Sequence, residues 1–250
     1  MSRHTLGLFD LQFEPSGKLG ALSFGQMAPF LADSFRREEL GNGYGFEARG
    51  WDECFPTIEP CGDSPVLGDL LWSPPVLTGD SSCVCQAWDT KRWRATRRFN
   101  LDGPGVLVME FSAWSGSDVP LPYLWASHTL FRLGGLKEVR FVDGFTLQAF
   151  ELDGSSSKTF RRNAGPIRMT RVDGEIILSS DQPWWGVWYN RGGWPAGRPG
   201  GVGALGLEAT TTDSDHPGAT RMQPGGSFHG TVRLECRPFG VNGGWIRRRP

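Results

Sequence analysis

The chain has 250 residues, of which 38% are hydrophobic, and its 26 Lys and Arg nearly balance its 27 Asp and Glu. This length supports one large domain or two small ones, and the hydrophobic content is ample for a sizeable core. The balanced charge argues against broad electrostatic capture of nucleic acid or of an anionic membrane, so we expect neither partner.

Targeting and metal-binding signals are not evident in the sequence. The first ten residues contain no apolar run long enough for a signal peptide, and no stretch approaches the length of a transmembrane helix. We therefore expect a cytoplasmic protein. The five cysteines include no Cys-x-x-Cys pair, so we expect neither a zinc site nor a disulfide framework.

Strand periodicity dominates the chain. One short helix is predicted near residues 30–40, closed by Gly41. Residues 106–111 are predicted to form a central strand with two apolar faces. Residues 231–237 alternate, with Val232, Leu234 and Cys236 on one face.

Four Asp-Gly dipeptides predict tight hairpins, because this pair tolerates the positive φ angles that such turns need. They begin at Asp102, Asp143, Asp153 and Asp173. Residues 139–142, 145–152, 168–172 and 175–179 are therefore predicted as successive antiparallel strands.

Three segments rich in Gly, Pro and Trp interrupt this pattern, at residues 41–72, 121–130 and 184–212. We expect them to be loops on a rigid β scaffold, where binding residues usually lie. No low-complexity linker separates them, so residues 1–250 are predicted to form a single domain. The 11 Trp against 3 Tyr are consistent either with stacking on the apolar faces of sugars or with the filling of a wide core.

Two ionisable side chains in these segments are candidates for proton transfer. His128 follows a strand start bounded by proline, although a lone histidine is more often structural than catalytic. Glu208 lies in the apolar run 204–210, where an unpaired carboxylate would be costly. Such a glutamate is either ion-paired or kept for proton transfer.

Several short segments, taken together and in order, resemble the aldose 1-epimerase (galactose mutarotase) superfamily over about residues 41–237. They are GWDECFPTI at 50–58, GDLLWS at 68–73, PLPYLWASH at 120–128, WYNRGGWP at 188–195, LEATT at 207–211 and MQPGG at 222–226. The resemblance implies an all-β fold, an antiparallel β-supersandwich with at most short helices, whose concave face receives a small carbohydrate.

The resemblance also implies a mechanism and two catalytic residues. Glu208 would take the proton of the anomeric C1 hydroxyl, while His128 would give a proton to the ring oxygen. The ring then opens, the C1 aldehyde rotates, and closure gives the other anomer, without a metal or an organic cofactor. An acid and a base on opposite sides of a pyranose should lie about 5–8 Å apart.

Further side chains near these motifs are candidates for substrate binding. Asp52 and Glu53 could bind sugar hydroxyls, with strand alternation turning one of them away. Arg49 could bind a hydroxyl, an acidic sugar or a phosphate, unless it pairs with a neighbouring carboxylate. The remaining candidates are Asn190, beside a Gly-Gly turn, and four possible stacking rings, Trp51, Trp125, Trp185 and Trp194. No role is assigned to His4, His216 or His229.

One position departs from the family pattern. The family places a second histidine directly before the glycine of the 68–73 motif, where this chain has Leu67. Leucine can neither donate nor accept a hydrogen bond, so a substrate contact is missing at that position. Two hypotheses follow: an aldose 1-epimerase-like isomerase, or a non-catalytic carbohydrate-binding or sensing protein on the same fold.

Overall fold

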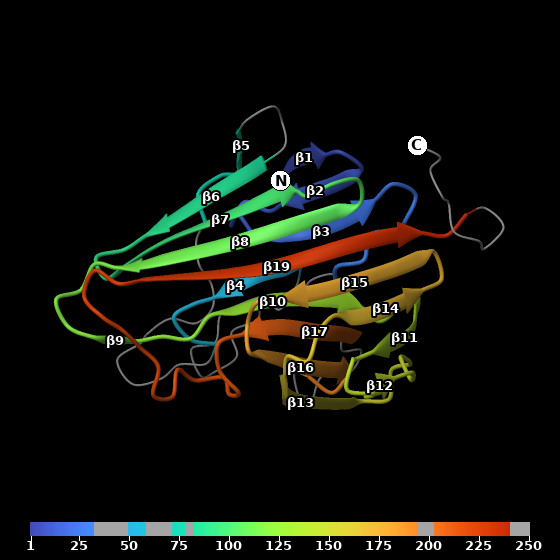
Figure 1. The fold of residues 1–250 in the computed structure, drawn as a ribbon. Helices are drawn as coiled ribbons and strands as arrows, with labels where there is room; N and C mark the ends of the chain where they lie inside the picture. Colours follow the sequence, from blue (N-terminus) through green and yellow to red (C-terminus); the bar gives the residue numbers. More distant parts are fainter. Residues whose placement is uncertain (33–49, 59–71, 79–82, 195–202, 241–250) are drawn as a thin grey trace.

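The structure is a computed structural model, and it describes residues 1–32, 50–58, 72–78, 83–194 and 203–240. These residues form two large antiparallel β-sheets stacked face to face and one small two-stranded sheet (Figure 1). They contain no helix. The predicted all-β antiparallel sandwich is therefore confirmed.

The first sheet carries the candidate site and has eight strands. In spatial order they are β1 (Ser2–Leu6), β2 (Phe9–Phe13), β3 (Leu19–Phe24), β4 (Trp51–Cys54), β10 (Ala126–Arg132), β17 (Gly203–Thr210), β16 (Trp184–Arg191) and β13 (Ser155–Arg162). Strands distant in the sequence are thus neighbours at the centre of this sheet.

The second sheet has nine strands and covers one face of the first. In spatial order they are β12 (Thr146–Leu147), β11 (Leu136–Arg140), β14 (Ile167–Arg171), β15 (Gly174–Ser180), β19 (Ser227–Pro238), β8 (Val106–Ser115), β7 (Trp93–Leu101), β6 (Cys83–Asp89) and β5 (Val76–Thr78). The small sheet pairs β18 (Arg221–Met222) with β9 (Leu121–Pro122). In Figure 1, β19, in red, lies directly beside β8, in green.

Apolar side chains that alternate along the strands of both sheets fill the space between them. The predicted alternation in β19 is confirmed, since Val232, Leu234 and Cys236 are buried in this core. β8 is central, as predicted, but only one of its faces is fully apolar. Its Phe111 is buried while Glu110 is exposed to solvent, because the outer face of the second sheet has no further layer over it.

Three of the four Asp-Gly dipeptides make the predicted hairpins, joining β7 to β8, β11 to β12, and β14 to β15. The dipeptide at Asp153 does not, because it connects β12 to β13, which belong to different sheets. Residues 145–152, predicted as a strand, contain only the two-residue β12.

The prediction that segments 41–72, 121–130 and 184–212 are loops is wrong for the larger part of their described residues, which form strands. They supply β4, β10, β16 and β17, four adjacent strands of the first sheet. β17 is buried at every position from Ala204 to Thr210, so both of its faces are covered. A strand covered on both faces has no apolar–polar alternation, which is the signal that a sequence reading relies on.

The short helix predicted near residues 30–40 falls mostly outside the described residues. Within them, Leu31 forms an isolated β-bridge with Phe131. Nowhere in the described ranges is there a helix long and apolar enough to cross a membrane.

Candidate active site

Strand register brings the two predicted catalytic residues together. His128 on β10 lies directly opposite Glu208 on β17. The same row continues to Asp52 on β4 at one side and to Gly186 on β16 at the other. Residues paired in this way have Cβ atoms about 5 Å apart, so two groups remote in the sequence are neighbours in the sheet.

His128 and Glu208 are in direct contact, with 3.3 Å between the His128 Nε2 and the Glu208 Oε1. The Glu208 side chain is completely buried, whereas that of His128 is 12% exposed. The separation of about 5–8 Å expected from the acid–base mechanism is therefore not found. In this conformation there is no room for a pyranose ring between the two groups.

A lysine completes the coordination of the carboxylate. The Lys158 Nζ lies 2.9 Å from the second oxygen of Glu208, Oε2. The same ammonium lies 2.6 Å from the Oδ1 of Asp215. His128, Glu208, Lys158 and Asp215 thus form one charged cluster, which we call the His–Glu–Lys–Asp cluster.

This cluster fixes the charge of its buried carboxylate. Burial alone would raise the pKa of Glu208, but the nearby charges of Lys158 and then His128 outweigh it and lower that pKa to about 2. Burial would lower the pKa of Lys158, yet the charges of Glu208 and Asp215 raise it above its ordinary value. Glu208 is therefore a carboxylate and Lys158 an ammonium at neutral pH.

Two glycines make room for the carboxylate. A Cβ at Gly186 would lie 3.0 Å from the Glu208 Oε2, and a Cβ at Gly206 would lie 3.2 Å from the Oε1. Glycine inside a strand is otherwise unfavourable, and it often marks a place where another group approaches closely. Here that group is the side chain of Glu208.

Two indole rings border the cluster. The ring of Trp188 is nearly parallel to the imidazole of His128, at an interplanar angle of 22° and a centroid distance of 6.4 Å. Trp194, one of the predicted stacking residues, packs edge-on against Trp188 with centroids 5.4 Å apart. Trp188 itself was not predicted. It is two residues after Gly186 on β16, so its side chain is on the same face of the sheet as Gly186.

Three of the predicted stacking rings lie elsewhere. Trp51, Trp125 and Trp185 are buried in the hydrophobic core between the sheets. Trp51 packs edge-on against Phe99 at 5.6 Å, and Trp125 stacks on Phe111 at 5.3 Å. These rings fill the core, which was the alternative to sugar stacking. Their positions on β4, on β16 and just before β10 turn them toward the second sheet.

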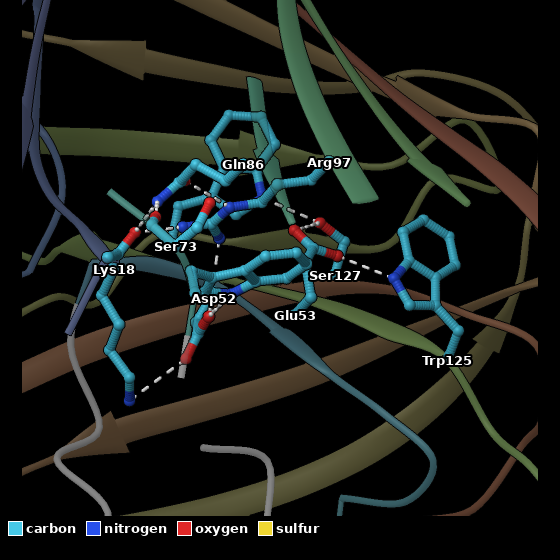
Figure 2. A network of polar contacts seen from close by, with 11 residues as sticks. Lys18, Asp52, Glu53, Ser73, Gln86, Arg97, Trp125 and Ser127 are labelled. Atoms are coloured by element: carbon cyan, nitrogen blue, oxygen red, sulfur yellow. Dashed lines mark hydrogen bonds and ion pairs between the residues drawn. The ribbon is translucent and has the colours of Figure 1, made fainter. Parts of the chain in front are cut away.

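Asp52 and Glu53 are both buried and held by polar contacts (Figure 2). Strand alternation turns them to opposite faces: Glu53 faces the core, whereas Asp52 lies in the same row as His128 and Glu208. The Asp52 carboxylate lies 3.2 Å from Lys18 and accepts a hydrogen bond from the Trp72 indole at 3.1 Å. Glu53 accepts a hydrogen bond of 2.7 Å from the Trp125 indole. Burial raises the pKa of Glu53 well above its ordinary value, although the charge of Arg97 opposes this effect.

The last predicted binding residues are explained by local structure or lie outside the described residues. Asn190 is fully buried, and its side chain binds the backbone of Trp194, accepting from the N–H at 3.0 Å and donating to the carbonyl at 3.2 Å. It therefore fixes the turn that presents Trp194. Arg49 and Leu67 both fall outside the described residues.

Sequence reasoning missed Lys158 and Asp215. Lys158 lies in the polar strand β13, and nothing in its own segment indicates that this strand is close to β17. Asp215 lies in the connection after β17. In the described part of the chain, no group of three or more His, Cys, Asp or Glu side chains could hold a metal ion.

Comparison with known proteins gives a fold but not a close relative. No protein-family model and no curated protein matches the sequence. A candidate aldose 1-epimerase of Escherichia coli K12 is similar in structure, with a TM-score of 0.67 and 14% identity over 95% of this chain and 99% of that one.

Two further solved structures show the same likeness. A galactose mutarotase-like protein of Clostridium acetobutylicum has a TM-score of 0.65 and 10% identity, covering 95% of both chains. An aldose epimerase homologue of C. elegans has a TM-score of 0.62 and 10% identity, covering 95% of this chain and 98% of that one. The chain therefore has the galactose mutarotase-like β-sandwich fold.

Proposed function

We propose that this protein is an aldose 1-epimerase-like isomerase that interconverts the anomers of a small sugar. The observation that carries the proposal is the contact between a partly exposed histidine, His128, and an ionised carboxylate, Glu208. A general acid and a general base are the two groups that opening of a pyranose ring requires. The fold adds support, because the structures that resemble this chain include aldose epimerase-like proteins.

The proposed reaction moves two protons and breaks one ring bond. A sugar would approach over His128 and Trp188, and its C1 hydroxyl would take the place of the His128 Nε2 beside the Glu208 Oε1. Glu208 then accepts the proton of that hydroxyl, His128 donates its Nε2 proton to the ring oxygen, and the bond between C1 and that oxygen breaks. Rotation of the aldehyde and the reverse transfers give the other anomer.

Polarimetry on freshly dissolved α-glucose and α-galactose tests the proposal. We expect the protein to accelerate the change in optical rotation in proportion to its concentration, above the buffer rate. A panel of other aldoses extends the search for the substrate. Failure to accelerate mutarotation of any sugar in the panel would contradict the proposal.

A second candidate function is carbohydrate binding without catalysis. It is favoured by the complete burial of Glu208. Both oxygens of this carboxylate already have a neighbour, His128 at the Oε1 and Lys158 at the Oε2. A binding protein would show saturable quenching of tryptophan fluorescence by a sugar, with no change in the mutarotation rate.

Under either function, Trp188 is expected to contribute to sugar binding. Replacing Trp188 with Ala should weaken binding about tenfold, because truncating a tryptophan that contacts a ligand often costs more than 1 kcal/mol. Isothermal titration calorimetry of the protein with the sugar measures this change. Trp114→Ala is a matched control, since Trp114 is on β8 in the other sheet. Equal affinities for the two variants would contradict the assignment.

A further inference from the structure

We propose that Lys158 is the positioning residue of Glu208, holding the Oε2 from a fixed anchor at Asp215 and leaving the Oε1 directed at His128. This inference rests on the proposed function, since it explains how the base of that reaction is kept in place. Lys158 was not among the residues that the sequence indicated. It is argued from three features of the first sheet.

The first feature is the path that the lysine takes across the sheet. Lys158 is on β13, and β16 lies between this strand and β17, which carries Glu208. The residue of β16 directly opposite Glu208 is Gly186. Lys158 itself is opposite Trp188, two residues further along β16. Because Gly186 has no side chain, the Glu208 carboxylate lies over it, and the lysine reaches the Oε2 at 2.9 Å.

The second feature is the anchor of the ammonium group. The Asp215 Oδ1 lies 2.6 Å from the Lys158 Nζ. The backbone carbonyl of Asp215 accepts hydrogen bonds from the Ile58 N–H at 3.3 Å and the Thr57 hydroxyl at 3.2 Å. Asp215 is thereby tied to the segment that follows β4, so the lysine is held between two carboxylates of fixed position.

The third feature is the burial of the base. Glu208 is completely inaccessible to solvent, and a carboxylate without a cation in such a place takes up a proton. A protonated Glu208 could not accept the proton of a C1 hydroxyl. Among the charges around it, that of Lys158 has the largest effect in lowering the pKa of Glu208.

Lys158→Met tests this inference, with Lys158→Arg as the matched variant that keeps the charge. The carboxyl ¹³C resonance of Glu208, assigned by its loss in Glu208→Gln, is followed between about pH 4 and pH 8. We expect a constant shift in the wild type and in Lys158→Arg, and a titration within this range in Lys158→Met. A constant shift in Lys158→Met, or a wild-type carboxyl that titrates near its ordinary pKa, would overturn the inference.

Activity provides an independent readout. Lowering the pH protonates Glu208 and abolishes its function as a base, so a raised Glu208 pKa moves the acidic limb of the kcat/KM profile to higher pH. We expect Lys158→Met to move this limb upward by at least one pH unit and Lys158→Arg to leave it unchanged. An unmoved limb in a folded Lys158→Met would also refute the inference.

The two proposals fail in different ways. If the wild type does not epimerise any sugar, the proposed function fails. The NMR titration of Glu208 still tests whether Lys158 holds this carboxylate in its ionised form. If Lys158→Met does not fold, Lys158→Gln replaces it, because glutamine also removes the ammonium charge, so the Glu208 pKa should again rise, while its amide can still form hydrogen bonds. A Glu208 titration unchanged by Lys158→Gln would then overturn the inference.

Discussion

Replacing Glu208 with Gln is expected to lower kcat for anomer interconversion by about 10²- to 10⁴-fold, the usual contribution of a general base. The amide has nearly the shape of the carboxylate, so it fits the space left by Gly186 and Gly206. It cannot accept the proton of the C1 hydroxyl. Polarimetry at saturating sugar measures the effect, and circular dichroism verifies the fold.

Glu53→Gln is a suitable control for this experiment. Glu53 is a second fully buried glutamate of the first sheet, but it faces the core and binds the Trp125 indole. Since burial raises its pKa, its protonated form is already close in shape and charge to glutamine. We expect Glu53→Gln to retain activity. A Glu208→Gln protein with more than about a tenth of the wild-type kcat would be incompatible with the proposed base.

Arg97→Met is expected to lower the free energy of unfolding by about 3–5 kcal/mol, the usual cost of removing one partner of a buried ion pair. Arg97 lies in the polar network of Figure 2, on the inner face of β7, with a completely buried side chain. It donates to the Gln86 Oε1 at 2.8 Å and to the Gly17 carbonyl at 2.5 Å, and it lies 3.5 Å from Asp52. Methionine would leave these acceptors without their buried donor.

Chemical denaturation measures the loss, and Arg94→Met on the same strand is its control. Arg94 has a 68% exposed side chain and pairs with Asp89 at the surface, where ion pairs contribute little. We expect its denaturation midpoint to match the wild type. The stability losses of Arg97→Met and Asp52→Asn should not simply add in the double variant, because the two residues are partners in one network. Equal midpoints for Arg97→Met and Arg94→Met would refute the stabilising role of the network.

The two sets of buried charges lie on either side of His128 in the same sheet. Asp52, opposite His128 on β4, is paired with Lys18, and Glu208, opposite it on β17, is paired with Lys158. The first pair belongs to the buried network of Figure 2, and its expected effect is on stability. The second pair borders the partly exposed imidazole, and its expected effect is on proton transfer.

The sequence by itself determined the fold class and the two candidates for proton transfer. Alternation of apolar and polar residues and Asp-Gly turns are local properties, so strands such as β19 and the hairpin of β7 and β8 could be predicted. The order of short motifs indicated the mutarotase-like fold. His128 and Glu208 were found because they lie within these motifs.

Only the tertiary structure decided which side chains meet. The order of strands across a sheet and their register depend on contacts between distant segments, and these also decide which face of each strand is covered. The core positions of Trp51, Trp125 and Trp185 follow from that order, as does the contact of Lys158 with Glu208, whose carboxylate lies over Gly186. No local pattern could place a lysine of β13 beside a glutamate of β17, because β14 and β15, which separate β13 from β16 in the sequence, belong to the other sheet.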